Sequence, residues 1–388
     1  MSAGGDPPKS LLVVRLGAMG DVIHTSYAVA LLRNALPETQ IGWVIEERWA
    51  ELLCAKRNPR SGARSTARPI VDFVHVVNTK AWRKSPLASG TRQQLSAALK
   101  EIRDQRYDVA VDFQGAIKSA LLARLCGART VIGMDRPRES PAKMLYSQRV
   151  QTRGTHVIEQ YCSMVEQVLG DRNRRTSLNP AHSTPSLHSV PQGRHNEDAR
   201  PATGIPSSLE FPLDDEAEQA VSRKLNDANS PIIVVNPGAG WGAKEWPAKR
   251  YGEVSRELAK QGAQVVVNYG PGEEQLAFAV RDLSDSAAYP ITCSIAELIA
   301  RTRRASLFIG GDTGPLHLAA ALGVPVVAIF GPTDPARNGP YSQKSIVLRN
   351  PASRTSLSHT SQPDPGLLQI TPDEVLAAAR KLLESNHA

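Results

Sequence analysis

The chain has 388 residues, of which 41% are hydrophobic and 22% charged, the proportions of a globular protein long enough for two domains with a core each. No basic segment followed by an apolar core opens the sequence, and no apolar run reaches the length of a membrane span. These features argue against a signal peptide and a transmembrane helix and predict a cytoplasmic protein.

The formal net charge of +8 favours an anionic partner. Basic residues concentrate in the first half of the chain, in a stretch at 56–68 that lacks acidic residues and again in Trp82-Arg83-Lys84. A nucleic-acid partner is not expected, because no nucleic-acid-binding motif accompanies the charge. The four cysteines are scattered and no His cluster lies near them, so the sequence predicts neither a zinc site nor disulfides.

Apolar runs and amphipathic segments alternate along the chain, and the pattern restarts near residue 231. In the first half, strands are predicted at 11–16, 42–46, 71–77, 108–113 and 130–133, with helices at 22–36 and 92–106. In the second half, strands are predicted at 232–236, 264–268, 306–310 and 326–330, with helices at 248–261 and 315–322. This alternation predicts two doubly wound, mostly parallel α/β domains whose strand ends share a cleft.

Residues 171–206 are rich in Ser, Pro, Asn, His and Arg and have no apolar period. Such a segment buries too little apolar surface to offset the entropy of ordering, so it is predicted to be a flexible linker or a surface excursion. It separates an N-terminal domain at 1–170 from a C-terminal domain at 207–388. Shorter excursions are predicted at 57–68 and 350–365.

A glycine-containing turn follows the first strand, with Gly17, Gly20 and then Asp21 at the start of a helix. A Rossmann pyrophosphate turn requires Gly-x-Gly-x-x-Gly, and a carboxylate at this place would repel a phosphate. The spacing alone favours Asp21 as an N-cap. The helix dipole also favours the ionised carboxylate, which can accept a proton, so a catalytic role stays open beside the capping role.

Residues 307–334 carry the strongest single signal. An apolar strand ends in Gly311-Asp312-Thr313-Gly314-Pro315, a tight turn into a helix whose first turn contains a proline. The free N–H groups and positive dipole end of that helix suit a diphosphate, and Thr313 and His317 can add side-chain donors. The turn therefore predicts a nucleotide-activated ligand.

Several segments recur in a fixed order over nearly the whole chain: 17–25 (GAMGDVIHT), 82–84 (WRK), 111–119 (VDFQGAIKS), 133–135 (GMD), 311–317 (GDTGPLH) and 330–334 (FGPTD). Together they resemble the lipopolysaccharide heptosyltransferases, glycosyltransferase family 9. The first-half segments are most similar to heptosyltransferase I. Residues 236–247 (NPGAGWGAKEWP) are closer to the heptosyltransferase II style, which leaves the subtype and the acceptor open.

The resemblance implies a GT-B architecture, in which two doubly wound Rossmann-like domains face each other across a cleft. The N-terminal domain would bind the acceptor and the C-terminal domain an ADP-heptose donor. Asp21 matches the general base of the family. Thr313, Gly314 and His317 match the diphosphate turn, Asp312 a contact to the donor sugar, Lys244 a cation at the phosphates and Glu273 a residue near the ribose. The acceptor-binding residues are expected to be Arg60, Arg64, Trp82, Arg83, Lys84, Gln114 and Lys118.

The implied reaction transfers heptose from ADP-L-glycero-D-manno-heptose to the Kdo region of the lipid A inner core. It inverts the anomeric centre in one displacement and uses no cofactor. No Asp-x-Asp lies beside the donor turn, so a metal-independent site is expected. The partners would be the nucleotide-sugar donor, the anionic Kdo–lipid A acceptor and, through peripheral contact, the cytoplasmic face of the inner membrane.

Three other interpretations remain open. Another sugar-nucleotide transferase of the same fold would share the 311–317 turn and differ in its acceptor. A nucleotide-dependent oxidoreductase is disfavoured by the missing Gly-x-Gly-x-x-Gly. A non-catalytic anion-binding module would need only the charge. Taken singly, His317 is better explained by helix packing and Lys244 by a solvated surface, and only the ordered combination favours the donor site.

Overall fold

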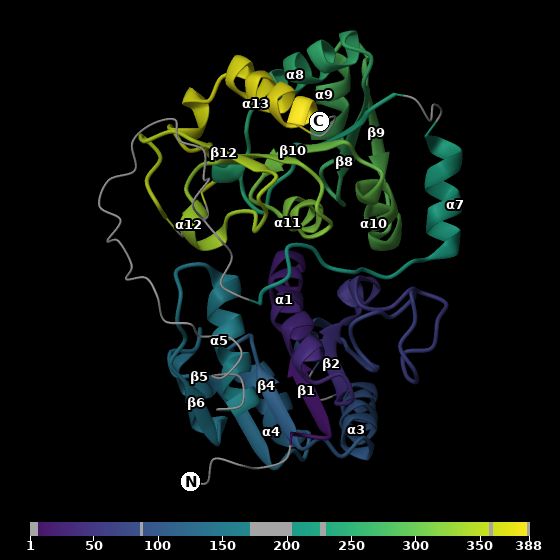
Figure 1. Ribbon diagram of the computed structural model, residues 1–388, viewed down its shortest axis with the longest axis vertical. Helices are drawn as coiled ribbons and strands as arrows, with labels where there is room; N and C mark the ends of the chain where they lie inside the picture. The colour runs from purple at the N-terminus through teal and green to yellow at the C-terminus, as the bar shows by residue number, and fades with distance from the viewer. Residues whose placement is uncertain (1–6, 86–87, 171–203, 226–229, 357–359, 386–388) are drawn as a thin grey trace.

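The computed structural model of the protein describes residues 7–85, 88–170, 204–225, 230–356 and 360–385. Figure 1 shows two α/β domains that follow one another along the long axis of the molecule, with α1 and α11 where they meet. Each domain contains a six-stranded sheet, with the order β3-β2-β1-β4-β5-β6 in the first and β12-β11-β10-β7-β8-β9 in the second. The strand pairs in both sheets are parallel. This architecture confirms the predicted α/β class and GT-B arrangement.

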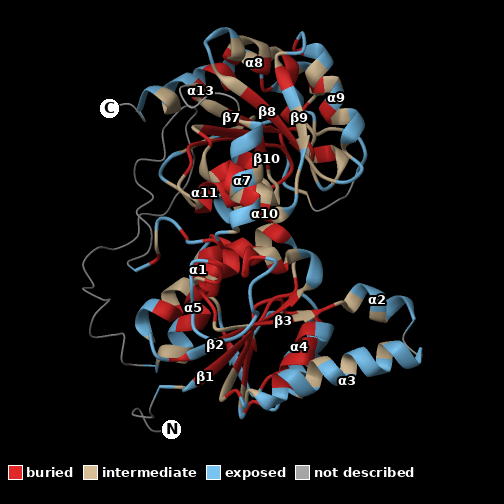
Figure 2. Ribbon diagram, turned by 90° about the vertical axis from the view of Figure 1, so that its right-hand side faces the viewer, coloured by how far each residue is buried: buried red, intermediate tan, exposed pale blue. Residues whose placement is uncertain are grey.

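The N-terminal sheet is buried on both faces, as its runs of Val, Ile and Leu require. Its strands are β1 (Ser10–Val14), β2 (Gln40–Glu46), β3 (Phe73–Val77), β4 (Val109–Asp112), β5 (Thr130–Met134) and β6 (Gln148–Val150). Helices α1 (Met19–Ala35) and α5 (Val157–Leu169) cover one face. The other face carries α2 (Thr79–Lys84), α3 (Ser89–Asp104), α4 (Ile117–Leu125) and the 3-10 helix η2 (Ser140–Leu145), as Figure 2 shows for α3 and α4. A further 3-10 helix, η1 (Glu47–Leu52), follows β2.

The C-terminal domain repeats this plan. Its strands are β7 (Ile232–Asn236), β8 (Gln264–Tyr269), β9 (Ala288–Thr292), β10 (Leu307–Gly311), β11 (Val326–Phe330) and β12 (Ser345–Arg349). Its helices are α7 (Asp215–Lys224), α8 (Ala248–Lys260), α9 (Glu274–Leu283), α10 (Ile295–Arg303), α11 (Gly314–Ala321), α12 (Pro335–Asn338) and α13 (Pro372–Ser385), with 3-10 turns η4 (Gly242–Lys244) and η5 (Leu367–Gln369). In each sheet the direction of strand addition reverses between two central strands, β1 and β4 or β7 and β10. Ligands of such sheets bind outside the carboxyl ends of the strands at this point.

The predicted strands all occur, and 232–236 and 326–330 match β7 and β11 exactly in their bounds. One local prediction is wrong. Helix α1 begins at Met19 instead of residue 22, so Ala18 is the N-cap and Asp21 is the third helical residue. The predicted linker at 171–206 lies almost entirely outside the described residues, so the domain boundaries stay a prediction. Leu209 and Phe211, just beyond it, are buried in the hydrophobic cluster that contains residues of both domains.

The two domains share buried contacts at their junction. Helix α1 packs on α11, and one hydrophobic cluster contains Met19 and Ile23 from the first domain together with Leu318 from the second. On the other side of the junction, the Glu51 carboxylate accepts a 2.9 Å hydrogen bond from the Ala296 amide at the start of α10. The junction therefore combines apolar packing with a side chain of one domain that caps a helix of the other.

Three imidazole rings gather at this junction. The His24 ring of α1 lies 4.3 Å from the His317 ring of α11 and 6.0 Å from the His156 ring, centroid to centroid. His156 Nε2 lies 3.0 Å from the Gly339 carbonyl oxygen of the other domain, which fixes a proton on that nitrogen. Burial lowers the pKa of His24 well below its ordinary value, and the neighbouring His317 lowers it further. Burial also lowers the pKa of His156, so the fold holds both rings in the neutral form.

The neutral histidines predict that acidification destabilises the protein between pH 7 and 5. Below about pH 6.5 each of these histidines binds a proton in the unfolded chain but not in the fold, so the free energy of unfolding falls by up to about 1.4 kcal/mol per pH unit for each. Thermal unfolding midpoints measured from pH 7.5 to 5 should decline, and less steeply in His24→Phe, which has no proton to bind. Equal pH slopes in the two proteins would contradict this account. Asp312, whose pKa is lowered, affects stability only in a separate window below about pH 4.

Candidate functional site

The first turns of α1 and α11 meet where the two domains join. A Cβ atom at Gly314 would lie 2.7 Å from Cβ of Met19, so a glycine is required for this approach. On the other side of the contact, the His317 ring packs against Gly20. Each helix follows the carboxyl end of a central strand, β1 or β10, beside the reversal in strand order. The contact thus brings together the segments that the sequence assigned to the general base and to the diphosphate turn.

Asp21 projects from the first turn of α1 and is 41% exposed. Its Oδ2 accepts a 3.2 Å hydrogen bond from the Ala18 amide and lies 2.5 Å from Arg15 Nη2. The contacts that the described residues make with the Asp21 carboxylate all end on Oδ2, so Oδ1 keeps its lone pairs for another donor. The carboxylate is therefore oriented on one side and accessible on the other, as a proton acceptor must be.

Arg15 contacts Asp21 from the buried side and was not predicted from the sequence to be a site residue. Its side chain is only 6% exposed, its Nη1 donates a 2.6 Å hydrogen bond to the Phe113 carbonyl, and its guanidinium lies 5.7 Å from the centre of the Tyr161 ring. A buried arginine needs an anion, and Asp21 supplies it. The signal that could have indicated this role is an arginine directly after an otherwise apolar strand.

The donor-side residues form a second ion pair in the other domain. Lys244 Nζ lies 2.5 Å from Asp312 Oδ2, and His317 Nε2 lies 3.1 Å from Asp312 Oδ1. Burial tends to raise the pKa of Asp312, but the hydrogen bond and charge of His317, followed by Lys244, outweigh it and hold this pKa far below its usual range. Asp312 is thus a permanent anion with a basic side chain on each oxygen.

The first turn of α11 has the features of an anion site. Pro315 occupies one of its first positions, Thr313 is the N-cap, and the turn contains no acidic residue. The Thr313 hydroxyl donates to the Gly311 carbonyl at 3.2 Å, and its oxygen accepts no hydrogen bond from the helix, so the N–H groups of the first turn have no side-chain cap. Lys244 extends over the Trp241 ring, with Nζ 4.1 Å from its centre. Cations and free amides therefore converge at the place predicted for a diphosphate.

Glu273 lies at the N-cap of α9, where Oε2 accepts a 2.8 Å hydrogen bond from the Gly270 amide. Its carboxylate occupies the space that a Cβ at Gly238 would fill, at 2.2 Å. A chain of hydrogen-bonded polar groups lies beside it: the partly buried Cys293 Sγ donates to Asn268 Oδ1 at 3.3 Å, and the buried Asn268 Nδ2 donates to Asn236 Oδ1 at 2.7 Å. Asn236 ends β7, Asn268 is the penultimate residue of β8 and Cys293 follows β9. Sequence reasoning missed them because each is an isolated polar residue after an apolar run.

The predicted acceptor residues separate into two groups. Gln114 and Lys118 follow β4 at the edge that carries Asp21. The Gln114 amide oxygen accepts from the Leu16 amide at 2.9 Å, and Lys118 Nζ lies 3.3 Å from Thr79 Oγ1 at the start of α2. That contact links Lys118 to the helix that contains the other members of this group, Trp82, Arg83 and Lys84.

Arg64 and Arg60 belong to the second group, on the 57–68 excursion. Arg64 Nη2 donates to the Pro37 carbonyl at 3.4 Å, at the far end of α1, and Nε lies 3.5 Å from Asp72 before β3. Helix α1 has 17 residues and so separates this place from Asp21 by about 24 Å at 1.5 Å per residue. The Arg60 carbonyl accepts from the Val74 amide at 2.8 Å. The structure does not bring this pair together with Asp21.

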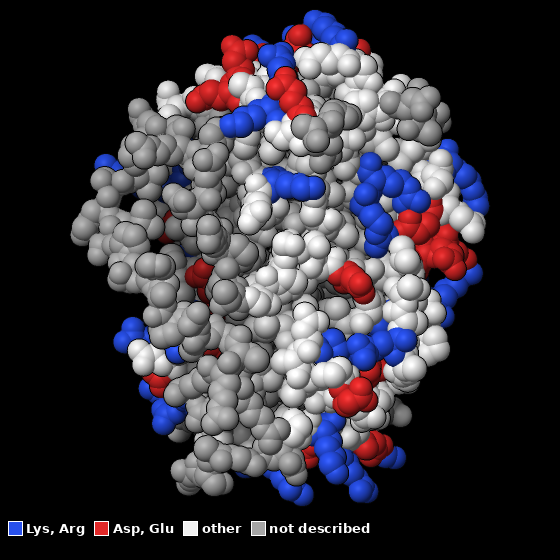
Figure 3. All heavy atoms as spheres, viewed as in Figure 1, with Lys and Arg blue, Asp and Glu red and all other residues white. Residues whose placement is uncertain are grey.

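The remaining arginines of the excursion have structural partners. Arg68 is buried, with Nη2 donating to the Gly62 and Ala63 carbonyls at 2.7 and 2.9 Å. Arg57 pairs with Glu216 of α7, where Figure 3 shows basic and acidic side chains next to one another. The excursion lies on the surface as predicted, but Arg68 holds its backbone in place.

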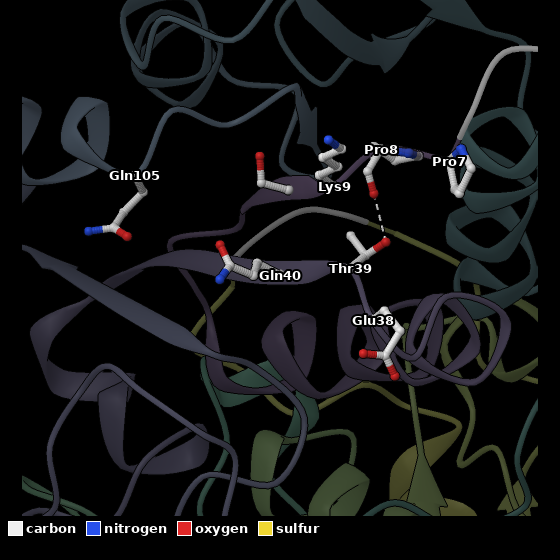
Figure 4. Close-up of a pocket in the computed structure, with 8 residues that line it drawn as sticks. Pro7, Pro8, Lys9, Glu38, Thr39, Gln40 and Gln105 are labelled. Carbon is white, nitrogen blue, oxygen red and sulfur yellow. Dashed lines mark hydrogen bonds between the residues drawn. The ribbon is translucent and has the colours of Figure 1, made fainter.

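Two hollows of the surface lie away from this constellation. Figure 4 shows one at the amino ends of β1 and β2, between Pro7–Ser10 and Glu38–Gln40, where the Thr39 hydroxyl donates to the Pro8 carbonyl at 2.7 Å. Another runs along β8 and β9. Within the ranges that the structure describes, no three His, Cys, Asp or Glu side chains are grouped to hold a metal ion. No helix in those ranges is long and apolar enough to cross a membrane.

Comparison with known proteins agrees with this geometry. Residues 95–364 match the model of glycosyltransferase family 9 (heptosyltransferase). Lipopolysaccharide heptosyltransferase 1 of Pseudomonas aeruginosa is 28% identical over 87% of this chain and 83% of its own length. The solved structure of E. coli heptosyltransferase WaaC with ADP has a TM-score of 0.68 at 24% identity, covering 97% of this chain and 99% of the other. A family 9 glycosyl transferase structure from Veillonella parvula has a TM-score of 0.75 at 22% identity, covering 99% and 100%. The chain is therefore a member of glycosyltransferase family 9, the heptosyltransferases.

Proposed function

We propose that this heptosyltransferase transfers heptose from ADP-L-glycero-D-manno-heptose to the Kdo region of the lipid A inner core. The observation that carries the proposal is the contact between α1 and α11, which brings the first turn of α1, with its accessible Asp21 carboxylate, against the Thr313–His317 turn of the other domain. The ADP of the solved E. coli relative and the name of the Pseudomonas relative support the donor and the acceptor. The enzyme would work in the cytoplasm, in peripheral contact with the inner membrane.

In the proposed reaction, Oδ1 of Asp21 takes the proton from an acceptor hydroxyl, whose oxygen attacks the anomeric carbon. The new glycosidic bond forms on the face opposite ADP while the bond from the anomeric carbon to the phosphate oxygen breaks, so the configuration inverts. The proton stays on Asp21 and ADP leaves with the bonding electrons. The groups that receive the departing charge are Lys244 and the N–H groups of α11 at Gly314, which stabilise it without a metal ion.

The other donor residues have supporting roles in this proposal. Thr313 and His317 would add hydrogen bonds to the diphosphate, Asp312 would contact the donor sugar, and Glu273 would bind the ribose. Acceptor anions would meet Gln114, Lys118 and the Trp82–Lys84 segment at the edge of the N-terminal sheet that carries Asp21. Arg60 and Arg64 would act on the acceptor over a longer range. A heptosyltransferase II acceptor is the second candidate, favoured by residues 236–247, which include Trp241 and Lys244.

The first test replaces the proposed base. Asp21→Asn keeps the size of the side chain and an oxygen for Arg15 and the Ala18 amide, but it loses the basicity. We expect near-parental ADP affinity and a kcat lower by about 100-fold or more, the usual scale of general-base catalysis. Transfer to a Kdo–lipid A acceptor measures kcat, and thermal unfolding monitors the fold. Near-parental turnover in the folded variant would exclude Asp21 as the base.

The second test concerns leaving-group stabilisation. Lys244→Ala should weaken ADP binding and transfer by about tenfold or more, because a hydrogen bond to a charged group contributes roughly 1.5 to 3 kcal/mol. Lys249→Ala, on the exposed side of α8, is the matched control and should bind ADP as the parent does. Calorimetric titration with ADP measures both, and unchanged affinity in Lys244→Ala would remove this lysine from the site. Transfer should also persist in a chelator, whereas a strict need for an added divalent ion would contradict the metal-free scheme.

The third test separates the two groups of acceptor cations. Replacing Arg83 and Lys84 by Ser should raise the acceptor KM several-fold and reduce its sensitivity to salt, because both extend from a helix at the carboxyl edge of the sheet. Replacing Arg60 and Arg64 by Ser should raise the KM less. Initial rates at low and high ionic strength give the comparison, with ADP affinity as the control. An unchanged KM in the Arg83 and Lys84 variant would limit this pair to solubilising the surface.

A further inference from the structure

The exposed large apolar side chains of the N-terminal domain lie in one place. Among residues 7–85 and 88–170 they are Ile117 and Leu121, each 45% exposed, and Met144, which is 83% exposed. Ile117 and Leu121 are four residues apart on α4 and share one side of that helix. The 3-10 helix η2, which contains Met144, packs beside α4, and Glu139 just before it accepts a 2.8 Å hydrogen bond from the Ile117 amide. We call these three residues and the elements that carry them the α4–η2 face.

The core of the domain does not need these side chains. The inner side of α4 is formed by Ala120, Leu122 and Ala123, which are buried together with Ala142 of η2. Ile117, Leu121 and Met144 point the other way, into solvent. A group of exposed apolar side chains that the core does not require is typical of a contact surface.

The charges of the α4–η2 face are all of one sign. Helix α4 contributes Lys118 and Arg124 and η2 contributes Lys143, all exposed, and neither element contains an acidic residue. Lys118 also contacts Thr79 of α2, whose last turn adds Arg83 and Lys84. The adjacent acid, Glu139, is engaged at the N-terminus of α4. The α4–η2 face therefore combines exposed apolar side chains with lysine and arginine side chains.

This composition selects between two kinds of partner. The buried core of a protein interface is depleted of charged residues and of lysine in particular, which the α4–η2 face is not. A lipid surface instead takes apolar side chains into the boundary between headgroups and acyl chains while lysine and arginine remain among anionic headgroups. The combination of Ile117, Leu121 and Met144 with Lys118, Arg124 and Lys143 fits the second partner.

We infer that the α4–η2 face is the surface by which the protein docks on an anionic lipid membrane, with Ile117, Leu121 and Met144 inserted at the level of the headgroups. The inference rests on the proposed peripheral contact with the inner membrane and names the surface of the protein that makes it. It does not depend on the transfer reaction. Helix α4 begins at the carboxyl edge of the N-terminal sheet, the same edge that carries Asp21. Docking here keeps the proposed acceptor side of the protein next to the membrane.

Sedimentation with lipid vesicles tests the inference without any substrate. The parent protein should bind vesicles that contain phosphatidylglycerol, and binding should weaken with phosphatidylcholine alone or at high salt. A triple variant, Ile117→Gln, Leu121→Gln and Met144→Gln, should bind about tenfold or more weakly, because the apolar area that enters the lipid is lost. A matched triple variant on exposed apolar residues of the other domain, Tyr289→Gln, Leu283→Gln and Leu368→Gln, should bind as the parent does. Equal binding by the parent and the α4–η2 variant, or no binding by the parent, would overturn the inference.

A second measurement locates the inserted side chain. In Met144→Trp, the tryptophan emission should shift to shorter wavelength when phosphatidylglycerol vesicles are added, beyond the shift of the parent. Binding without such an added shift would place the membrane elsewhere and contradict the inference. ADP binding and thermal unfolding, measured on every variant, show that the fold is intact. If the parent binds vesicles but transfers no heptose, the proposed reaction fails and the docking surface stands.

Discussion

The contact between the first turns of α1 and α11 is the constraint on which the site depends. It exists because Gly314 has no side chain where Met19 arrives and because the His317 ring packs against Gly20. Two helix N-termini, both positive dipole ends, thereby come together from different domains, an arrangement that repels unless anions lie nearby. Asp21 and Asp312 are those anions in the protein itself, and each is already paired with a cation of its own domain. A diphosphate is the further anion that we propose for this junction.

The two ion pairs differ in a way that matches their proposed roles. In the first pair the cation is buried and the anion is 41% exposed. The arginine therefore orients the carboxylate from the protein side, and the carboxylate remains accessible from the solvent side. In the second pair both side chains are only 10% exposed, and His317 supplies a third member. A half-exposed carboxylate can exchange a proton with a bound hydroxyl. The buried pair, with His317 beside it, keeps Asp312 ionised.

The fold was predictable because its central strands are apolar on both faces, as in Ile232–Asn236 and Val326–Phe330. Continuous apolar runs of this length are typical of the buried strands of a parallel sheet. The edge strands β6, β9 and β12 were not predicted, since Gln148–Val150 is short and polar and Ala288–Thr292 contains a proline. In the site, the 311–317 turn was readable as a local motif. The partners of its residues were not, because Arg15 with Asp21, Lys244 with Asp312 and His24 with His317 are brought together by packing of separate segments, and in the last case of separate domains. Asp21 was placed at the N-cap because an aspartate there is so common, and the helix in fact begins earlier, at Met19.

The Lys244–Asp312–His317 arrangement would let the proposed donor site bind a diphosphate without a large loss of internal stability. Removing one partner from a buried ion pair ordinarily costs about 3 to 5 kcal/mol, because the other charge is left alone. Asp312 has Lys244 on one oxygen and His317 on the other, at 2.5 and 3.1 Å. If Lys244 turns toward a diphosphate, Asp312 keeps the contact to His317, and the His24 ring on the far side keeps that imidazole in place. In the proposed reaction the carboxylate thus keeps a partner throughout, and the lysine can move with the phosphate as its charge grows during bond cleavage.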